Sequence, residues 1–151
     1  MQYLFSDNLK PCNLAPAETP FIFLAEDDID DQELLIDALT AQNDRLKVLT
    51  ASNGKKAITC LENLPDESLP CLIVLDYNLP EINGGQILQS LCGNDRYHAI
   101  PKVVWSTSNS HVYRQLCLDL GAKAYFVKPS NLSDVKSLAR EMLRFCEASK
   151  N

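Results

Sequence analysis

Apolar residues along this chain fall into five short runs that alternate with amphipathic segments. Each run is mostly apolar or alternating and is followed by polar or turn-forming residues, which is typical of strands in a buried sheet. The runs are Phe21–Ala25, Leu46–Ala51, Leu72–Leu75, Lys102–Trp105 and Ala124–Val127. After each run, apolar residues recur at helical spacing, so each of these segments is predicted to be a helix that buries one face.

The helical spacing also indicates which side chains are buried and where each helix begins. In the first helix the buried face is predicted to contain Leu34, Leu35, Ala38 and Leu39. In the last helix it is predicted to contain Val135, Leu138, Ala139, Met142, Phe145 and Cys146. Residues that favour helix starts precede each segment, namely Asp30 or Asp31, Asn53-Gly54, Gly84 or Gly85, Ser108–Ser110, and Ser130 or Asn131.

Strict alternation of strands and helices with short connections predicts an α/β fold with a parallel sheet between two layers of helices. The expected form is a doubly wound (βα)5 sheet with strand order 2-1-3-4-5, the flavodoxin-like arrangement. The domain is predicted to span residues 21–147, and residues 148–151 form a C-terminal tail. Residues 1–20 contain Pro11, Pro16 and Pro20 without sustained periodicity, so they are interpreted as an extension that is ordered only if it docks.

Composition and charge narrow the class of protein. The chain has 151 residues, 46% hydrophobic and 23% charged, which suits one domain with a substantial core. A net charge of −6 argues against a nucleic-acid-binding surface, which is normally basic. No apolar stretch is long enough to cross a bilayer, and the N-terminus lacks the pattern of a signal peptide. A cytoplasmic location, away from membranes, is therefore expected.

Six cysteines are scattered along the chain without a C-x-x-C pair, at positions Cys12, Cys60, Cys71, Cys92, Cys117 and Cys146. Disulfides need an oxidising compartment, and a zinc site needs clustered cysteine or histidine ligands. We therefore expect all six thiols to be reduced and mostly structural.

The residues at the ends of the predicted strands suggest chemistry. Glu26 and Asp27 follow the first strand, Asp76 ends the third, and Lys128 follows the fifth. Ligands of such sheets bind outside the carboxyl ends of the strands, so these groups are expected to meet there. An all-oxygen cluster suits a hard cation such as Mg²⁺, and a carboxylate can act as the nucleophile that forms an aspartyl phosphate.

These motifs resemble the receiver domain of two-component response regulators. The resemblance spans about residues 21–147 and rests on four segments in order: Glu26-Asp27-Asp28, Asp76-Tyr77-Asn78-Leu79-Pro80 with Gly84, Ser106, and Lys128-Pro129. It implies a single-domain regulator similar to the chemotaxis-type and phytochrome-associated ones. It also implies a cis Lys128–Pro129 peptide bond.

The resemblance assigns a role to each residue of the site. Asp76 is expected to be the phosphoacceptor. Mg²⁺ is expected to bind Asp27, Asp76 and the backbone carbonyl of Asn78 directly, and Glu26 through a water molecule. Ser106 and Lys128 would stabilise the phosphoryl group, and Tyr125 would be the switch aromatic that turns inward on activation. Thr107 stands where the family usually has a smaller residue and is expected to gate access to the acceptor.

The function implied is a phosphorylation-operated binding module. A sensor histidine kinase or a histidine phosphotransfer protein would phosphorylate Asp76, and the surface of the fourth helix, fifth strand and fifth helix would change its affinity for an unknown downstream protein. A homodimer is left open. The module is not expected to be an enzyme, although it would assist its own phosphoryl transfer and autodephosphorylation.

Two alternatives stay open. A phosphatase or phosphotransferase with an aspartate nucleophile would usually carry a second aspartate two residues after the first, where this chain has Asn78. A degenerate receiver that acts as a constitutive interaction module is disfavoured by the intact Glu26, Asp27, Asp76 and Lys128.

Overall fold

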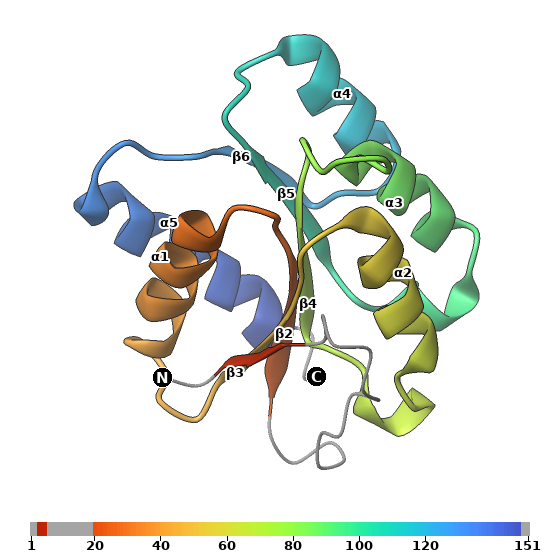
Figure 1. Ribbon diagram of the computed structural model, residues 1–151, viewed down its shortest axis with the longest axis horizontal. Coiled ribbons are helices and arrows are strands. Elements are labelled where there is room, and N and C mark those ends of the chain that lie inside the picture. The colour runs from red at the N-terminus through yellow and green to blue at the C-terminus, as the bar shows by residue number, and fades with distance from the viewer. Residues whose placement is uncertain (1–2, 6–19, 149–151) are drawn as a thin grey trace.

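The structure, a computed structural model, describes residues 3–5 and 20–148. Its described residues form one parallel sheet with helices on both faces (Figure 1). The strand order is β1-β3-β2-β4-β5-β6. The strands are β1 Tyr3–Phe5, β2 Phe21–Ala25, β3 Lys47–Ala51, β4 Leu72–Asp76, β5 Lys102–Ser106 and β6 Ala124–Val127.

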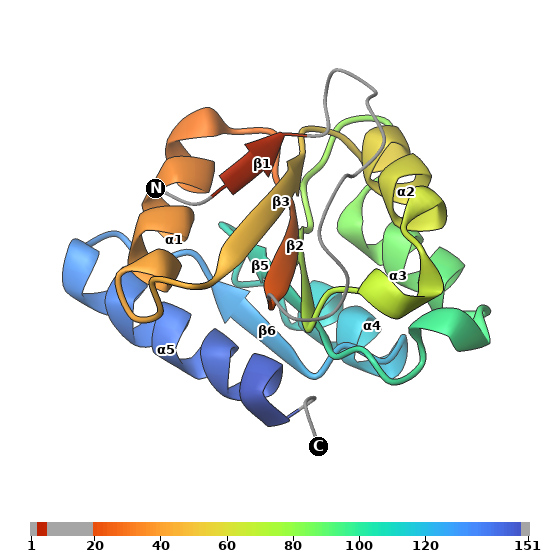
Figure 2. The ribbon, with the colours of Figure 1, turned by 90° about the horizontal axis from the view of Figure 1, so that it is seen from below.

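Two helices cover one face of the sheet, and three cover the other (Figures 1 and 2). The first layer consists of α1 Ile29–Thr40 and α5 Leu132–Ala148. The second layer consists of α2 Gly54–Asn63, α3 Gly84–Cys92 and α4 His111–Asp119. Two short 3-10 helices, η1 Asp66–Ser68 and η2 Asp95–Tyr97, lie in the connections before β4 and β5. Strands β2 to β6 therefore have the predicted doubly wound 2-1-3-4-5 order, which confirms the fold.

The sheet has one strand more than the sequence pattern predicts. Tyr3–Phe5 pairs in parallel with the outer edge of β3, and Tyr3 lies opposite Val48. Part of the N-terminal extension thus docks on the domain by backbone pairing. Residues 6–19, which carry Pro11, Pro16 and Cys12, lie outside the described residues.

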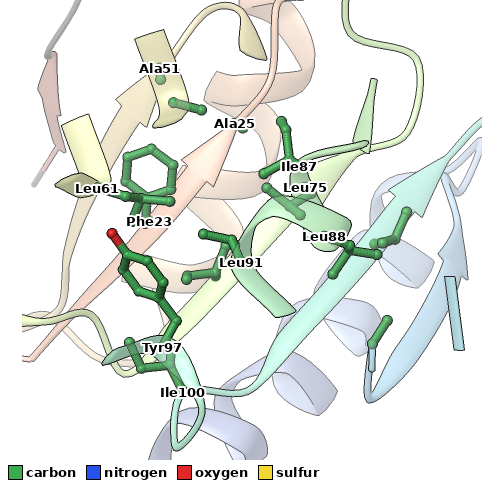
Figure 3. Close-up of a cluster of buried hydrophobic side chains, with 14 of the residues drawn as sticks. Phe23, Ala25, Ala51, Leu61, Leu75, Ile87, Leu88, Leu91, Tyr97 and Ile100 are labelled. Carbon is green, nitrogen blue, oxygen red and sulfur yellow. The ribbon is translucent and has the colours of Figure 1, made fainter. Parts of the chain in front are cut away.

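The core consists of two apolar layers, one on each face of the sheet. Successive side chains of a strand point to opposite faces, so Phe23 and Leu75 pack toward α2 and α3, whereas Ile22 and Leu24 pack toward α1 and α5. Figure 3 shows Phe23 and Leu75 with Leu61, Leu88 and Leu91 in the apolar layer that faces α2 and α3. Burial on both faces explains why the strands read as nearly continuous apolar runs.

Three helices begin at the capping residues predicted from the sequence, and α1 has a different cap. Asn53, Ser110 and Asn131 accept backbone N–H groups at the starts of α2, α4 and α5, as expected. The cap of α1 is Asp28, whose Oδ1 accepts from the N–H of Asp31 at 3.0 Å, so the prediction of Asp30 or Asp31 is wrong. Both alternatives lie within the first turn, because the helix begins directly after the acidic motif.

Some side chains differ from their predicted positions. Leu34 is exposed, because Ile36 takes its place on the buried face of α1. At the end of α5 Leu143 is buried, whereas Phe145 is only partly buried. The described residues contain no cis peptide bond, so the expected cis Lys128–Pro129 bond is wrong and that bond is trans.

Two cysteines are paired, contrary to the prediction that all are reduced. Cys71 precedes β4 and Cys146 lies near the end of α5, and a disulfide joins them with a Cα–Cα distance of 4.8 Å. They are 75 residues apart in sequence, so only the packing of α5 against the sheet brings them together. Of the other described cysteines, Cys60 and Cys117 are buried and Cys92 is exposed. None of the described helices is both long and apolar enough to cross a membrane.

Candidate functional site

The candidate site lies at the carboxyl edge of the sheet, where β2, β4, β5 and β6 end side by side. Glu26 follows β2, Asp76 is the last residue of β4, and Lys128 follows β6. The register places Asp76 beside Trp105 and Ser106 beside Val127. Parallel pairing alone therefore brings together groups that are more than 100 residues apart in the chain.

Lys128 is the cationic centre of this site. Its Nζ lies 2.8 Å from Glu26 Oε1, 2.8 Å from Asp31 Oδ2 and 3.2 Å from Asp76 Oδ2. Burial by itself lowers the pKa of Lys128, but Asp31, Glu26 and Asp76 outweigh that effect and hold the pKa above its ordinary value. The ammonium group therefore stays charged across the physiological pH range.

Glu26 is a fully buried carboxylate. Its burial and the neighbouring Asp76 raise the pKa of Glu26 to about 8, although Lys128 and the N–H of Asp28 oppose this shift. The N–H of Asp28 donates to Glu26 Oε2 at 3.1 Å. The side-chain amide of Gln32 donates to the Glu26 carbonyl oxygen at 2.5 Å and fixes the backbone there. Glu26 is thus held rigidly in an environment that disfavours its negative charge.

Carboxylate oxygens of Glu26, Asp27 and Asp76 lie within 4.8 Å of one another. Asp27 is exposed, whereas Glu26 and Asp76 are buried, so the cluster opens to solvent on one side. Crowded oxygen donors with an open side fit a hard cation that keeps part of its water shell, such as Mg²⁺. The predicted acidic residues are therefore brought together as a metal site requires.

The loop after β4 orients both oxygens of the acceptor candidate. The N–H of Asn78 donates to Asp76 Oδ1 at 3.0 Å, while Oδ2 faces Lys128. Gly84 lies so close beneath this loop that a Cβ there would be 2.7 Å from the Asp76 carbonyl oxygen. The start of α3 thus packs directly against the backbone of Asp76, and only glycine allows that approach.

Ser106 is buried at the end of β5 and is already part of a hydrogen-bonded network. Its Oγ accepts the side-chain N–H of Asn78 at 3.3 Å and the N–H of Ser108 at 3.1 Å. Thr107, the predicted access gate, is exposed beside it. The serine hydroxyl therefore links the acceptor loop to the loop that leads into α4.

Aromatic side chains connect this edge of the sheet to α4. Tyr125 lies inward, buried, and its hydroxyl donates to the Ser108 carbonyl oxygen at 2.9 Å. Tyr77, next to the acceptor candidate, stacks on Tyr113 of α4 with ring centroids 4.6 Å apart. Sequence reasoning missed this stack, because Tyr77 follows β4 whereas Tyr113 lies on α4, and nothing in the sequence pattern pairs the two residues.

Sequence reasoning also missed the environment of Lys128. Asp31 appeared only as a possible helix cap. Trp105 is buried, and Lys128 Nζ lies 4.8 Å from the centre of its ring. No periodicity or motif could have found these contacts, because they depend on where the long lysine side chain reaches.

The sequence and the fold both resemble those of known proteins. The family described as "Response regulator receiver domain" matches residues 22–140, which is most of the chain. The chain belongs to this family. Phosphorylation on an aspartate and binding of Mg²⁺ are typical of its members, which are signalling domains of two-component systems.

Curated relatives of this receiver domain include plant proteins. The two-component response regulator ORR5 of Oryza sativa is 29% identical over 125 residues, covering 83% of this chain and 90% of the relative. ORR4 of the indica subspecies is 31% identical over 144 residues, covering 85% of this chain and 62% of the relative.

Solved structures show the same likeness. The phosphorylated cyanobacterial phytochrome response regulator RcpA has a TM-score of 0.77 and 30% identity, covering 86% of this chain and 95% of that one. The Mn²⁺-bound response regulator Rcp1 has a TM-score of 0.74 and 27% identity, covering 83% and 93%.

Proposed function

We propose that this receiver domain accepts a phosphoryl group on Asp76 and signals through a phosphorylation-dependent protein surface. The observation that carries the proposal is the position of the Asp76 carboxylate, between the acidic cluster with Glu26 and Asp27 and the ammonium group of Lys128. The donor would be a phosphohistidine of a sensor histidine kinase or of a histidine phosphotransfer protein.

In the transfer step, a carboxylate oxygen of Asp76 attacks phosphorus, the bond between phosphorus and the donor imidazole nitrogen breaks, and the imidazole leaves with that electron pair and takes up a proton. Glu26, Asp27, Asp76 and the Asn78 carbonyl would hold Mg²⁺, which supplies positive charge to the phosphoryl oxygens. Lys128 and Ser106 would bind the same oxygens from the protein side. Attack by water on phosphorus would later break the bond between phosphorus and the Asp76 oxygen, which restores the carboxylate and releases inorganic phosphate. Thr107 would lie beside the path of this water molecule.

The output surface would be formed by α4, β6 and α5. Large apolar side chains are exposed on these elements, with Val112 73%, Leu116 44% and Leu132 56% exposed. Ser106 and Tyr125 connect them to the acceptor loop through Ser108. Movement of Ser106 toward the phosphoryl group would therefore shift an existing equilibrium of α4 and change the affinity for a downstream protein or for a second copy of the chain.

The test is incubation with a small phosphodonor, such as acetyl phosphate, and Mg²⁺. The expected result is one acid-stable, base-labile phosphoryl group per chain, located at Asp76 by peptide mapping. Asp76→Asn is the matched control, because it keeps the shape and removes the nucleophile, and it should stay unphosphorylated while folding normally. Continuous turnover of the donor would favour the phosphatase alternative, and absence of any phosphoryl group would favour the degenerate receiver.

A further inference from the structure

Asp31 contacts Lys128 although it belongs to none of the four motifs. It lies in the first turn of α1, and its Oδ2 is 2.8 Å from Lys128 Nζ, closer than the 3.2 Å contact between Nζ and Asp76. Its side chain is 32% exposed, whereas those of Glu26 and Asp76 are 0% and 4% exposed. Asp31 is therefore the solvent-accessible member of the three carboxylates that surround the ammonium group in the described residues.

An ammonium group has three N–H donors and no acceptor. In this structure three carboxylates, those of Glu26, Asp31 and Asp76, lie within reach of Lys128 Nζ. Nζ donates to Asp31 and Asp76, and Glu26 Oε1 lies 2.8 Å away as an ion-pair partner. A phosphoryl group on Asp76 can take over the contact that the Asp76 carboxylate makes, and any further phosphoryl oxygen must compete with Asp31 and Glu26 for the same ammonium group. Release of Asp31 costs least, because water can replace the lysine at its partly exposed carboxylate, whereas no water reaches the fully buried Glu26 to take the place of Lys128.

The helix also favours this release. Asp31 stands in the first turn of α1, where a free carboxylate interacts favourably with the N-terminal end of the helix dipole. Its backbone N–H remains bonded to Asp28 Oδ1 regardless of where the side chain points. The helix start can therefore persist when the ion pair with Lys128 breaks.

We propose that Asp31 is a positioning residue that holds Lys128 while Asp76 is unphosphorylated and releases it when Asp76 carries a phosphoryl group. The proposal rests on the acceptor role proposed for Asp76. Asp31 competes with the phosphoryl oxygens for the ammonium group, so it disfavours the contact between Lys128 and the phosphoryl group. It thereby limits how far phosphorylation shifts the conformational equilibrium of the protein.

The test is the affinity of the protein for beryllofluoride, a stable mimic of the phosphoryl group, in the presence of saturating Mg²⁺. Trp105 is the only tryptophan in the chain, and Lys128 Nζ lies 4.8 Å from its ring centre, so tryptophan fluorescence reports directly on the lysine. Asp31→Asn should bind beryllofluoride about two- to fivefold more tightly than the wild type, the range expected for loss of one partly exposed ion pair. Asp31→Glu, which keeps the carboxylate, should return the affinity toward the wild-type value.

Asp30→Asn is the matched control. Asp30 is exposed in the same helical turn, and its substitution removes the same charge from the same end of α1. Among the described residues Asp31, and not Asp30, pairs with Lys128. A gain in affinity that is specific to Asp31→Asn therefore separates the ion pair from general charge and helix effects.

Each other outcome overturns the proposal. Equal affinities for Asp31→Asn and Asp30→Asn, with binding retained by the wild type, would reject the role of Asp31 while leaving that of Asp76 intact. Weaker beryllofluoride binding by Asp31→Asn, together with weaker Mg²⁺ binding, would show that Asp31 acts through the metal instead. Failure of the wild type to bind beryllofluoride would overturn the acceptor assignment, and the role of Asp31 with it.

Discussion

Crowding of like charges dominates the candidate site at the level of single residues. Glu26, Asp27, Asp31 and Asp76 lie near a single ammonium group, that of Lys128, in the described part of the chain. Burial, followed by the neighbouring Asp76, raises the pKa of Glu26. The excess negative charge makes binding of a divalent cation favourable. Affinity for a cation and protonation of Glu26 are therefore coupled.

This coupling predicts a pH-dependent metal affinity. The pKa of Glu26 is about 8 in the folded protein against an ordinary value of 4.5, so the residue holds a proton at neutral pH that a bound cation would displace. Mg²⁺ affinity should rise by up to about tenfold per pH unit below pH 8 and level off above it. Isothermal titration at pH 6, 7 and 8.5, in buffers of different ionisation enthalpy, would measure both the affinity and the released proton.

Glu26→Gln is the control for this experiment, because the amide cannot titrate. Its Mg²⁺ affinity should be nearly independent of pH over the same range. A wild-type Mg²⁺ affinity that does not change between pH 6 and 8.5 would contradict the displacement of a Glu26 proton by the cation.

The raised pKa of Glu26 also affects the stability of the fold without metal. The unfolded state releases the Glu26 proton at lower pH than the folded state, so Glu26 stabilises the fold fully below pH 4.5, and this stabilisation is lost as pH rises toward 8.

A second prediction at the residue scale concerns Thr107. This residue is exposed directly after Ser106, and we expect it to gate access to Asp76. Its β-branched side chain has few rotamers, so it should obstruct both the donor and the attacking water. Thr107→Ala should speed phosphorylation by acetyl phosphate and loss of the phosphoryl group, with little change in melting temperature. Unchanged rates with a clear fall in melting temperature would indicate a structural role instead.

At the scale of elements, the disulfide between Cys71 and Cys146 ties the start of β4 to the end of α5. A bond that closes a separation of 75 residues restricts the unfolded chain, and this should stabilise the fold by about 2–4 kcal/mol. Dithiothreitol should therefore lower the melting temperature of the wild type. The double variant Cys71→Ser, Cys146→Ser should melt at this lower temperature and be insensitive to reductant, and an equal reductant effect in both proteins would contradict the assignment.

Helices and strands with a clear pattern of apolar residues could be predicted from the sequence, whereas contacts between distant segments could not. Strands such as Phe21–Ala25 are recognisable as continuous apolar runs because they are buried on both faces. Helices such as Leu132–Ala148 are recognisable by helical periodicity because they bury one face. Tyr3–Phe5 has too few residues for a pattern, and its pairing depends on the free edge of β3. The disulfide, the burial of Trp105 and the contact of Asp31 with Lys128 likewise depend on packing between distant segments.

The residues of the candidate site that follow strands could also be predicted from the sequence. Glu26, Asp27, Asp76, Ser106 and Lys128 follow directly from strand ends, and parallel pairing forces strand ends together. A residue on a helix, such as Asp31, reaches the site only through the direction of its side chain. Its position in the sequence therefore carries no comparable signal.

At the scale of the whole molecule, a cation bound at the acidic cluster would link metal binding to folding. Glu26, Asp27 and Asp76 come from two different strand ends and gather only in the folded sheet. The unfolded chain has no comparable cluster, so a cation that binds there stabilises the folded state by mass action. The gain should be measurable as a rise in melting temperature.

Mg²⁺ at about tenfold above its dissociation constant should add about 1.4 kcal/mol to the free energy of unfolding, which corresponds to a rise of roughly 3–6 °C for a domain of this size. Asp27→Ala removes the exposed carboxylate of the cluster without disturbing the core, so it should lose most of this rise. Melting curves with MgCl₂, compared with NaCl at equal ionic strength, separate specific binding from screening of the net charge of −6. A wild type that melts at the same temperature in both salts, or an equal Mg²⁺ effect in Asp27→Ala, would exclude a metal at these carboxylates, and the proposed phosphoryl transfer would then have to proceed without one.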